Sequence, residues 1–209
     1  MKKFHVRIRY IEDVLASLPA NKELHSEYIA SKAPDAPSRE EEIAALGAEA
    51  VEEKKKTVFS KFEDGTPFLW DYQIKGFFKD ACNMLRNADD SKSASIKAYK
   101  KNIDGLVFVE PRKIPLKLPE NGVIGDNQRP LRAQTPQGER VTLANSETAP
   151  MGSEQEFDVK LLKSSMFPVV VEWLQYGELR GIGQWRNSGM GRFKFAIVDE
   201  NGKKLAGNL

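Results

Sequence analysis

The sequence predicts an α+β fold, and three kinds of pattern lead to this prediction. Short segments alternate apolar and polar residues, as β-strands do when one of their faces is buried. Two longer segments place apolar residues three and four positions apart, as amphipathic helices do. The stretches between them are rich in proline, glycine or charged residues, which is typical of loops and insertions.

Composition narrows the class of protein before any motif is considered. The 209 residues are 40% hydrophobic and 30% charged, which fits one globular domain spanning residues 1–209. A net charge of +2 is too small to indicate a nucleic-acid partner, so any basic surface must arise from clustering. No apolar run approaches the roughly 18 residues that span a bilayer, and we expect a cytoplasmic protein without membrane contact.

The cysteine and histidine content argues against metal and disulfide sites. Cys82 is the only cysteine, which excludes an internal disulfide and a cysteine-rich zinc site. His25 lies in a loop without a second histidine or a carboxylate at ligand spacing, so a structural role is expected for it. We therefore expect no metal and no cofactor.

The first predicted strand, residues 3–10, has one apolar and one basic face. Its even-numbered residues are Phe4, Val6, Ile8 and Tyr10, and its odd-numbered residues are Lys3, His5, Arg7 and Arg9. An edge strand with a solvated polar face would show the same pattern. On a central strand the basic face would be costly unless it met anions, so His5, Arg7 and Arg9 are candidate nucleic-acid contacts.

A charged helix is predicted at residues 38–56, as an insertion. Ser38-Arg-Glu-Glu41 is a capping box, and the acidic start and Lys54-Lys55-Lys56 end suit the helix dipole. Its apolar stripe is thin, so we expect an exposed helix whose charges are solvated.

The core helices and remaining strands follow in an order that specifies the plan of the fold. Helices are predicted at residues 74–86 and 167–177, and strands at 105–110, 156–162 and 191–198. With the first strand, the order is βαββαβ, the ferredoxin-like or RRM-like plan, in which helices cover one sheet face and the other can stay open for a ligand. In this plan the first strand is central. Lys75 is predicted in the first turn of its helix, where free amides and a lysine could meet a phosphate.

Residues 111–155 form a second predicted insertion, rich in proline, glycine and polar residues. Thr135-Pro-Gln-Gly138 has proline and glycine where a type I turn favours them, so residues 131–135 and 140–143 are predicted to form a projecting, thumb-like hairpin. Its basic residues Arg129, Arg132 and Arg140 are candidate nucleic-acid contacts. A disordered surface loop is the alternative.

Residues 178–198 contain a glycine-rich loop followed by the last strand. Four glycines, Gly181, Gly183, Gly189 and Gly191, surround Trp185, Arg186 and Arg192. Glycine lets a partner approach backbone amides, an indole offers a flat face for a base, and arginine offers charge for phosphate. A glycine-rich bend plugged by Trp185 is the structural alternative.

Three segments together resemble the RAMP superfamily, the ferredoxin-like RNA-binding proteins of CRISPR effector complexes. Pro67–Lys79 resembles the strand, turn and "SLKG"-type helix start of these proteins, and Gly181–Phe195 resembles their C-terminal glycine-rich loop and strand. Ala149–Val159 resembles the segment between the two, in the same order. The resemblance covers about half the chain and is closest to the backbone subunits that polymerise along a guide RNA.

The resemblance implies that the sheet and the glycine loop hold RNA, with residues 129–143 as a thumb. Lys75 matches the motif lysine, and Gly181, Gly183, Gly189 and Gly191 match the loop glycines. Target-cleaving members carry an aspartate ahead of the first core helix, and this chain has none at residues 54–57. Guide-processing members use a loop histidine, and neither histidine of this chain has a companion base in the sequence. No catalytic residue is expected.

The leading interpretation is a non-catalytic protein that binds single-stranded RNA or DNA and assembles side by side along the strand. It would act as a CRISPR-effector-like backbone subunit or as a stand-alone coat, with further copies or other effector subunits as partners. One alternative is a metal-independent endoribonuclease with His5 or His25 as general base. Another is a protein-interaction module, virus-encoded in one version, that joins or blocks a CRISPR complex.

Overall fold

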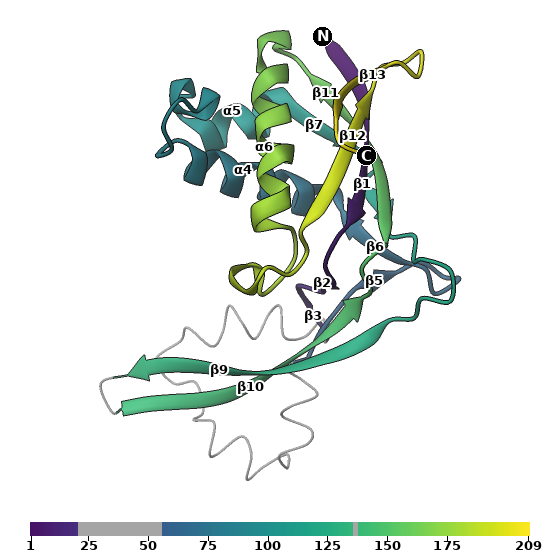
Figure 1. Ribbon diagram of the computed structural model, residues 1–209, viewed down its shortest axis with the longest axis vertical. Helices are drawn as coiled ribbons and strands as arrows, with labels where there is room; N and C mark the ends of the chain where they lie inside the picture. The colour runs from purple at the N-terminus through teal and green to yellow at the C-terminus, as the bar shows by residue number, and fades with distance from the viewer. Residues whose placement is uncertain (21–55, 136–137) are drawn as a thin grey trace. The chain divides into compact units, whose positions relative to one another are not determined.

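The computed structural model describes residues 1–20, 56–135 and 138–209 (Figure 1). It confirms the α+β class, since the helices α4 (Asp71–Leu85), α5 (Tyr99–Leu106) and α6 (Phe167–Arg180) accompany three sheets. The helix predicted at residues 38–56, except for Lys56, and His25 lie outside the described residues. Contacts divide the chain into two compact units. The first unit comprises residues 1–14, 60–123 and 149–209, and the second comprises residues 15–59 and 124–148.

A five-stranded sheet organises the first unit. Its strands are β1 (Lys2–Tyr10), β7 (Val107–Glu110), β11 (Glu154–Leu161), β12 (Phe193–Val198) and β13 (Lys204–Gly207), in the spatial order β13-β12-β1-β11-β7. The N-terminal strand is central, as predicted, and runs antiparallel to both β11 and β12. Each of the strands β7, β11 and β12 lies within two residues of its predicted bounds at both ends, because the alternation that marks them is local.

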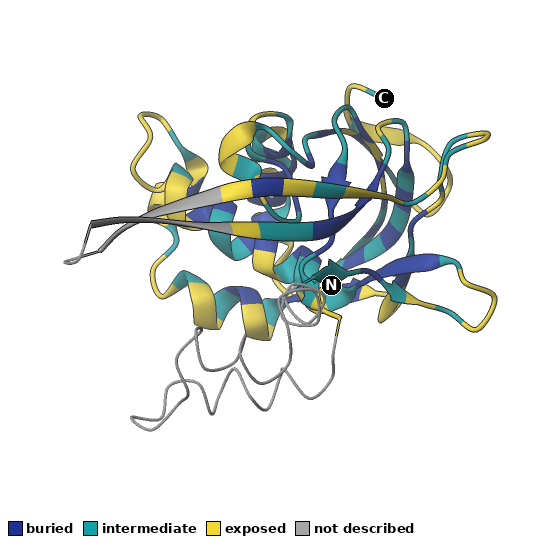
Figure 2. Cartoon of the chain, turned by 90° about the horizontal axis from the view of Figure 1, so that it is seen from below, coloured by how far each residue is buried: buried dark blue, intermediate teal, exposed yellow. Residues whose placement is uncertain are grey.

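Helices α4 and α6 lie on one side of this sheet (Figure 1). The even-numbered apolar residues of β1, Phe4 to Tyr10, are buried beneath them, as the alternation predicted. The rings of Phe4 on β1 and Phe167 on α6, 5.1 Å apart, join the sheet to the helices, and those of Phe78 and Trp173, 5.5 Å apart, join α4 to α6. Buried residues alternate with more exposed ones along β1 and β11, and the colours of Figure 2 mark each residue's burial on the chain.

The approach of α6 to the sheet depends on one glycine. A Cβ at Gly177 would lie 2.1 Å from the Phe193 ring on β12. No carbon can come that close without displacing a neighbour, so Gly177 allows the helix to pack directly on the strand.

A short segment after α4 is tied to α6 by a single carboxylate. Glu172 accepts hydrogen bonds from the backbone amides of Lys92 and Ser93 and from the Ser93 hydroxyl, in the 3-10 turn η1 (Lys92–Ser95). The buried Trp173 indole donates to the same hydroxyl at 3.0 Å. Two further 3-10 turns are present: η2 (Ser164–Met166) directly precedes α6, and η3 (Arg186–Ser188) lies in the glycine loop.

The first unit also contains a small sheet, β5-β6-β8, formed by β5 (Ser60–Lys61), β6 (Pro67–Trp70) and β8 (Lys113–Pro115). Its pairing sets Lys113 directly opposite Trp70. Strand β6 runs straight into α4, because the Trp70 amide donates to the Gln73 side chain at 2.7 Å and closes the first turn of the helix.

The second unit contains the predicted hairpin. Strands β9 (Gly125–Thr135) and β10 (Gly138–Ala149) pair along their length and are longer than the predicted segments. Residues 136 and 137 of the predicted turn lie outside the described residues. The short strands β2 (Val14–Leu15), β4 (Thr57–Val58) and β3 (Leu18–Pro19) complete this sheet in the order β2-β10-β4-β3.

Candidate nucleic-acid interface

The polar face of the five-stranded sheet carries the predicted basic residues of β1. The register sets Arg9 opposite Glu154, Arg7 opposite Glu156 and His5 opposite Asp158. Residues paired directly across antiparallel strands project to the same side of a sheet. The cations of β1 therefore face a row of carboxylates from β11.

One carboxylate serves two arginines. Glu154 accepts from Arg7 Nη2 and from Arg9 Nε, each at 2.6 Å. Burial opposes ionisation of Glu154, but the hydrogen bonds from Arg7 and Arg9 prevail and lower its pKa. Arg7 Nε also lies 3.8 Å from Glu156 Oε1, and 45% and 48% of the Arg7 and Arg9 side chains stay exposed.

His5 has an acidic partner that the sequence did not reveal. Its Nδ1 lies 2.9 Å from Asp158 Oδ1, while Lys3 Nζ lies 3.0 Å from Asp158 Oδ2. Burial would raise the pKa of Asp158, but hydrogen bonds from His5 and Lys3 lower it. The three side chains line a shallow hollow of about 460 Å³ beside Asp199 and Glu200. Asp158 is 153 positions from His5, so only strand pairing could identify it.

The glycine-rich loop follows α6 and has a narrow neck. Gly181 and Gly191 have positive φ, and a Cβ at Gly191 would lie 1.8 Å from the Ile182 carbonyl oxygen. The Ile182 amide donates to Gly191 O at 2.9 Å, which closes the neck. These two glycines therefore serve the packing of the loop itself.

The end of the loop has a different character. Gly183 and Gly189 also have positive φ, and a Cβ at Gly189 would make only ordinary contacts with the Arg192 side chain. Trp185 adopts the left-handed conformation at φ 56° and is 37% exposed. A bulky residue in this conformation is uncommon and is a known feature of binding loops.

The loop arginines anchor the loop through ion pairs. Asp80 on α4 accepts from Arg186 Nη1 at 2.7 Å and from Arg180 Nε at 3.3 Å, and Arg180 also donates to Asn187. Arg192 Nη2 lies 2.6 Å from a Glu12 carboxylate oxygen. Because Glu12 follows β1, the loop is held at the end of the strand that carries Arg7 and Arg9. The structure thus brings the loop and the basic strand into one unit.

Lys75 lies on α4, although not in its first turn as predicted. The helix begins at Asp71, and the side chain of Gln73 caps it, so Lys75 falls in the second turn, away from the free amides. Lys75 Nζ donates to the Asp104 carbonyl oxygen at 3.2 Å and lies 5.2 Å from the Phe108 ring centroid.

The three hairpin arginines belong to the second unit. Arg129 is 4% exposed, and its Nη1 donates to Ser146 at 3.0 Å; burial lowers its pKa. Arg129, predicted as a nucleic-acid contact, is thus a buried side chain in this structure. Arg132 pairs with Val141 and Arg140 with Ala133, so the two are not partners across the hairpin.

A cluster of aromatic and basic residues on the small sheet was not predicted. It consists of Phe62, Phe68, Trp70, Tyr72, Arg112 and Lys113, and we call it the aromatic platform. The alternation of Phe68, Trp70 and Tyr72 was the available signal. The basic members are some 40 positions further on and join them only through the pairing of β6 with β8.

The described residues contain no group of three histidine, cysteine, aspartate or glutamate side chains arranged to hold a metal ion. None of the helices within the described ranges is both long and apolar enough to cross a bilayer.

Comparison with known proteins identifies a similar fold and no family. No protein-family model matches the sequence, and no curated protein matches it. The structure is similar to a chain of the Type III-B Cmr-beta complex, solved by cryo-EM bound to cognate target RNA, with a TM-score of 0.54 and 10% sequence identity. The match covers 95% of this chain and 61% of that chain, so this chain spans about three fifths of its neighbour. At this identity the likeness concerns the fold.

Proposed function

We propose that this protein binds single-stranded nucleic acid without cleaving it, through a RAMP-like fold with a ferredoxin-like core. The order β12-β1-β11-β7, with α4 and α6 on one face, supports the ferredoxin-like core of this proposal. The neighbour of similar fold was solved with target RNA bound, which supports RNA as the ligand. Fold alone does not establish function, so the site must carry the argument.

The observation that carries the proposal is the geometry of the glycine loop. Its neck is fixed by Gly181 and Gly191 and its flank by the ion pairs to Asp80, while Trp185 is held partly exposed in a left-handed conformation. A rigid loop that presents an indole is suited to stack on a base, because the ordering cost is met during folding. Arg7 and Arg9, close to the point where the loop rejoins the sheet, supply positive charge for phosphates.

The test is binding of the purified protein to a labelled single strand of about 40 nucleotides, as RNA and as DNA. Trp185→Ala should weaken binding about tenfold, the loss expected for one stacked base, without changing the unfolding transition. Leu205→Ala is the matched control, because Leu205 is also 37% exposed and lies outside the loop, on β13. Equal affinities of wild type and Trp185→Ala would remove the loop from the interface.

The pair His5–Asp158 favours a second candidate function, metal-independent RNA cleavage. A carboxylate bound to Nδ1 orients an imidazole so that Nε2 can accept a proton. His5 would take the proton of a ribose 2′-hydroxyl, whose oxygen would attack the adjacent phosphorus and release the 5′-oxygen, which takes a proton from solvent. Cleavage of RNA but not DNA in a chelator, lost in His5→Ala, would support this reaction, and intact RNA with wild-type protein would exclude it.

A further inference from the structure

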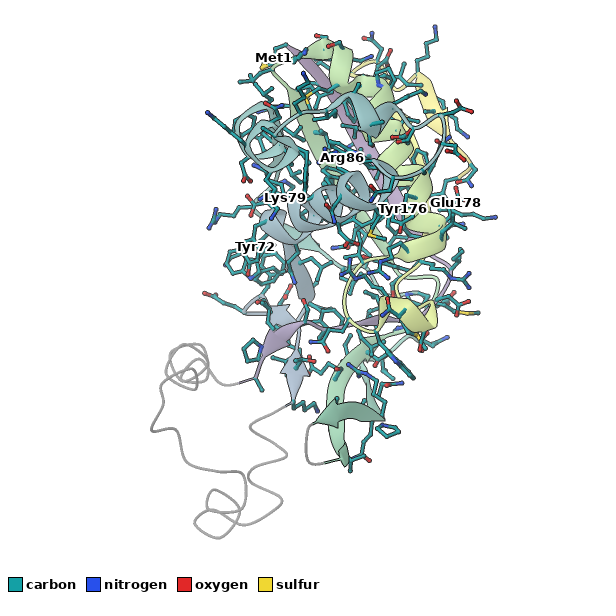
Figure 3. All side chains as sticks on the ribbon, turned by 90° about the vertical axis from the view of Figure 1, so that its left-hand side faces the viewer. Met1, Tyr72, Lys79, Arg86, Tyr176 and Glu178 are labelled. Carbon is teal, nitrogen blue, oxygen red and sulfur yellow. The ribbon has the colours of Figure 1, made fainter. Side chains whose placement is uncertain are left out.

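The aromatic platform has a geometry that core packing alone does not require. Phe68 is 3% exposed and belongs to the core, but Tyr72 is 49% exposed. The Trp70 and Tyr72 rings are nearly parallel, at 15°, with centroids 6.1 Å apart. The indole is fixed because its Nε1 donates to the Ser60 hydroxyl at 3.0 Å. The two rings therefore present an offset, ordered pair of flat surfaces at the protein's edge, where Figure 3 labels Tyr72.

The cations of the platform differ from those of the glycine loop. Lys113 Nζ lies 5.3 to 5.8 Å from the centroids of Phe62, Phe68 and Trp70, and it forms no ion pair with any described residue. Arg112 lies over the Trp70 ring, and 74% of its side chain is exposed. Its ion pair with Asp71, at 3.8 Å, is longer than a hydrogen bond. These charges are thus held by rings and remain open to an anion.

This arrangement restricts the ligand. Aromatic cages that bind a quaternary ammonium group need empty space between the rings for the ligand's cation. Here the ammonium group of Lys113 already lies over the rings. An exposed tyrosine ring beside a lysine and a largely exposed arginine whose one ion pair is long suits a ligand that is both planar and anionic. Unpaired nucleotides have this character, because each base offers a π-face and each phosphate a charge.

We infer that the aromatic platform is a second contact for the single strand, in which Tyr72, supported by Trp70, stacks on a base and Arg112 binds a phosphate. The inference rests on the proposed function, because it assigns another contact to the same ligand. It adds a site where β6 meets the start of α4, beside β8, rather than on β1 or the glycine loop.

The experiment compares affinities for the same labelled strand at several salt concentrations. Tyr72→Ala should weaken binding about tenfold, while Tyr72→Phe, which keeps the ring, should retain it. Arg112→Gln should reduce the magnitude of the slope of log affinity against log salt concentration by about 1, the change expected for the loss of one phosphate contact. Tyr176→Ala is the matched control, since Tyr176 is a partly exposed tyrosine on α6, labelled in Figure 3, and is not part of the platform.

The outcomes separate this inference from the proposed function. In one outcome, wild-type protein binds the strand and Trp185→Ala weakens binding, but Tyr72→Ala and Arg112→Gln do not. The aromatic platform is then not a contact, and the proposed function stands. If wild-type protein binds neither RNA nor DNA, the proposed function fails and the inference with it. A change in self-association of Tyr72→Ala with unchanged nucleic-acid affinity would assign the platform to a protein contact and overturn the inference.

Discussion

Individual cations of this protein are tuned by carboxylates that lie far away in the sequence. Arg7 and Arg9 share Glu154, and Arg186 and Arg180 share Asp80. Each such pairing lowers the charge available to a phosphate while it fixes the arginine in place. An arginine whose sequence neighbours offer no ion-pair partner can therefore have both a structural and a binding role.

Removal of the shared carboxylate should strengthen nucleic-acid binding. Glu154→Gln removes the carboxylate that Arg7 and Arg9 share and leaves Arg7 only its longer contact with Glu156, at 3.8 Å, so the affinity for a single strand should rise and its salt dependence should steepen. The free energy of unfolding should fall by about 1 kcal/mol, because partly exposed ion pairs contribute little. Filter binding and urea unfolding would measure the two effects. Unchanged affinity would show that Arg7 and Arg9 do not contact the ligand.

The same carboxylates should make stability depend on pH in the acid range. The pKa values of Glu154 and Asp158 are lowered in the folded protein from ordinary values of 4.5 and 3.8. Their contribution is fully present above about pH 4.5 and is lost as the pH falls through the lowered folded values. Urea unfolding from pH 7 to pH 3 would measure this loss, which should be smaller in the double variant Glu154→Gln/Asp158→Asn. An equal loss in that variant would assign it to other carboxylates.

At the scale of elements, the glycine loop combines two kinds of glycine. Gly191 is required by a close backbone approach, whereas Gly189 is required only by its positive φ. The difference separates the part of the loop that maintains the fold from the part that can meet a ligand.

Gly191→Ala should destabilise the protein by about 3 kcal/mol, because it adds a clash with the Ile182 carbonyl to the strain of positive φ. Gly189→Ala, the matched control, should cost about 1 kcal/mol, since its new methyl group makes only ordinary contacts. Thermal and urea unfolding would give both values. Similar values for the two variants would mean that the neck can relax, and that close approach is not what requires Gly191.

At the scale of the whole molecule, the fold resembles that of a chain from an RNA-bound complex, and assembly side by side along a strand stays a proposal. A coat that adds one copy per unit length of strand should produce complexes whose mass rises in regular steps with strand length. Analytical ultracentrifugation with strands of increasing length would measure this. A constant stoichiometry of one protein per strand would exclude side-by-side assembly and leave single-copy binding.

The sequence determined the local elements, because their signals are local. Alternation marked β1, β11 and β12, and helical spacing marked α4 and α6, since each pattern depends only on residues a few positions apart. The glycine loop was also visible in the sequence. In the structure, Gly191 holds the loop together and the Trp185 side chain is partly exposed.

The tertiary structure alone decided which charges meet. Glu154 lies 147 positions from Arg7, and Lys113 reaches Phe62 only because β8 pairs with β6 and β6 with β5. Such partners depend on the register between paired strands, which is set by packing of the whole core. The alternation within each strand does not show which residue of the other strand will lie opposite. For this reason the basic face of β1 was predicted from the sequence, but its carboxylates and the aromatic platform were not.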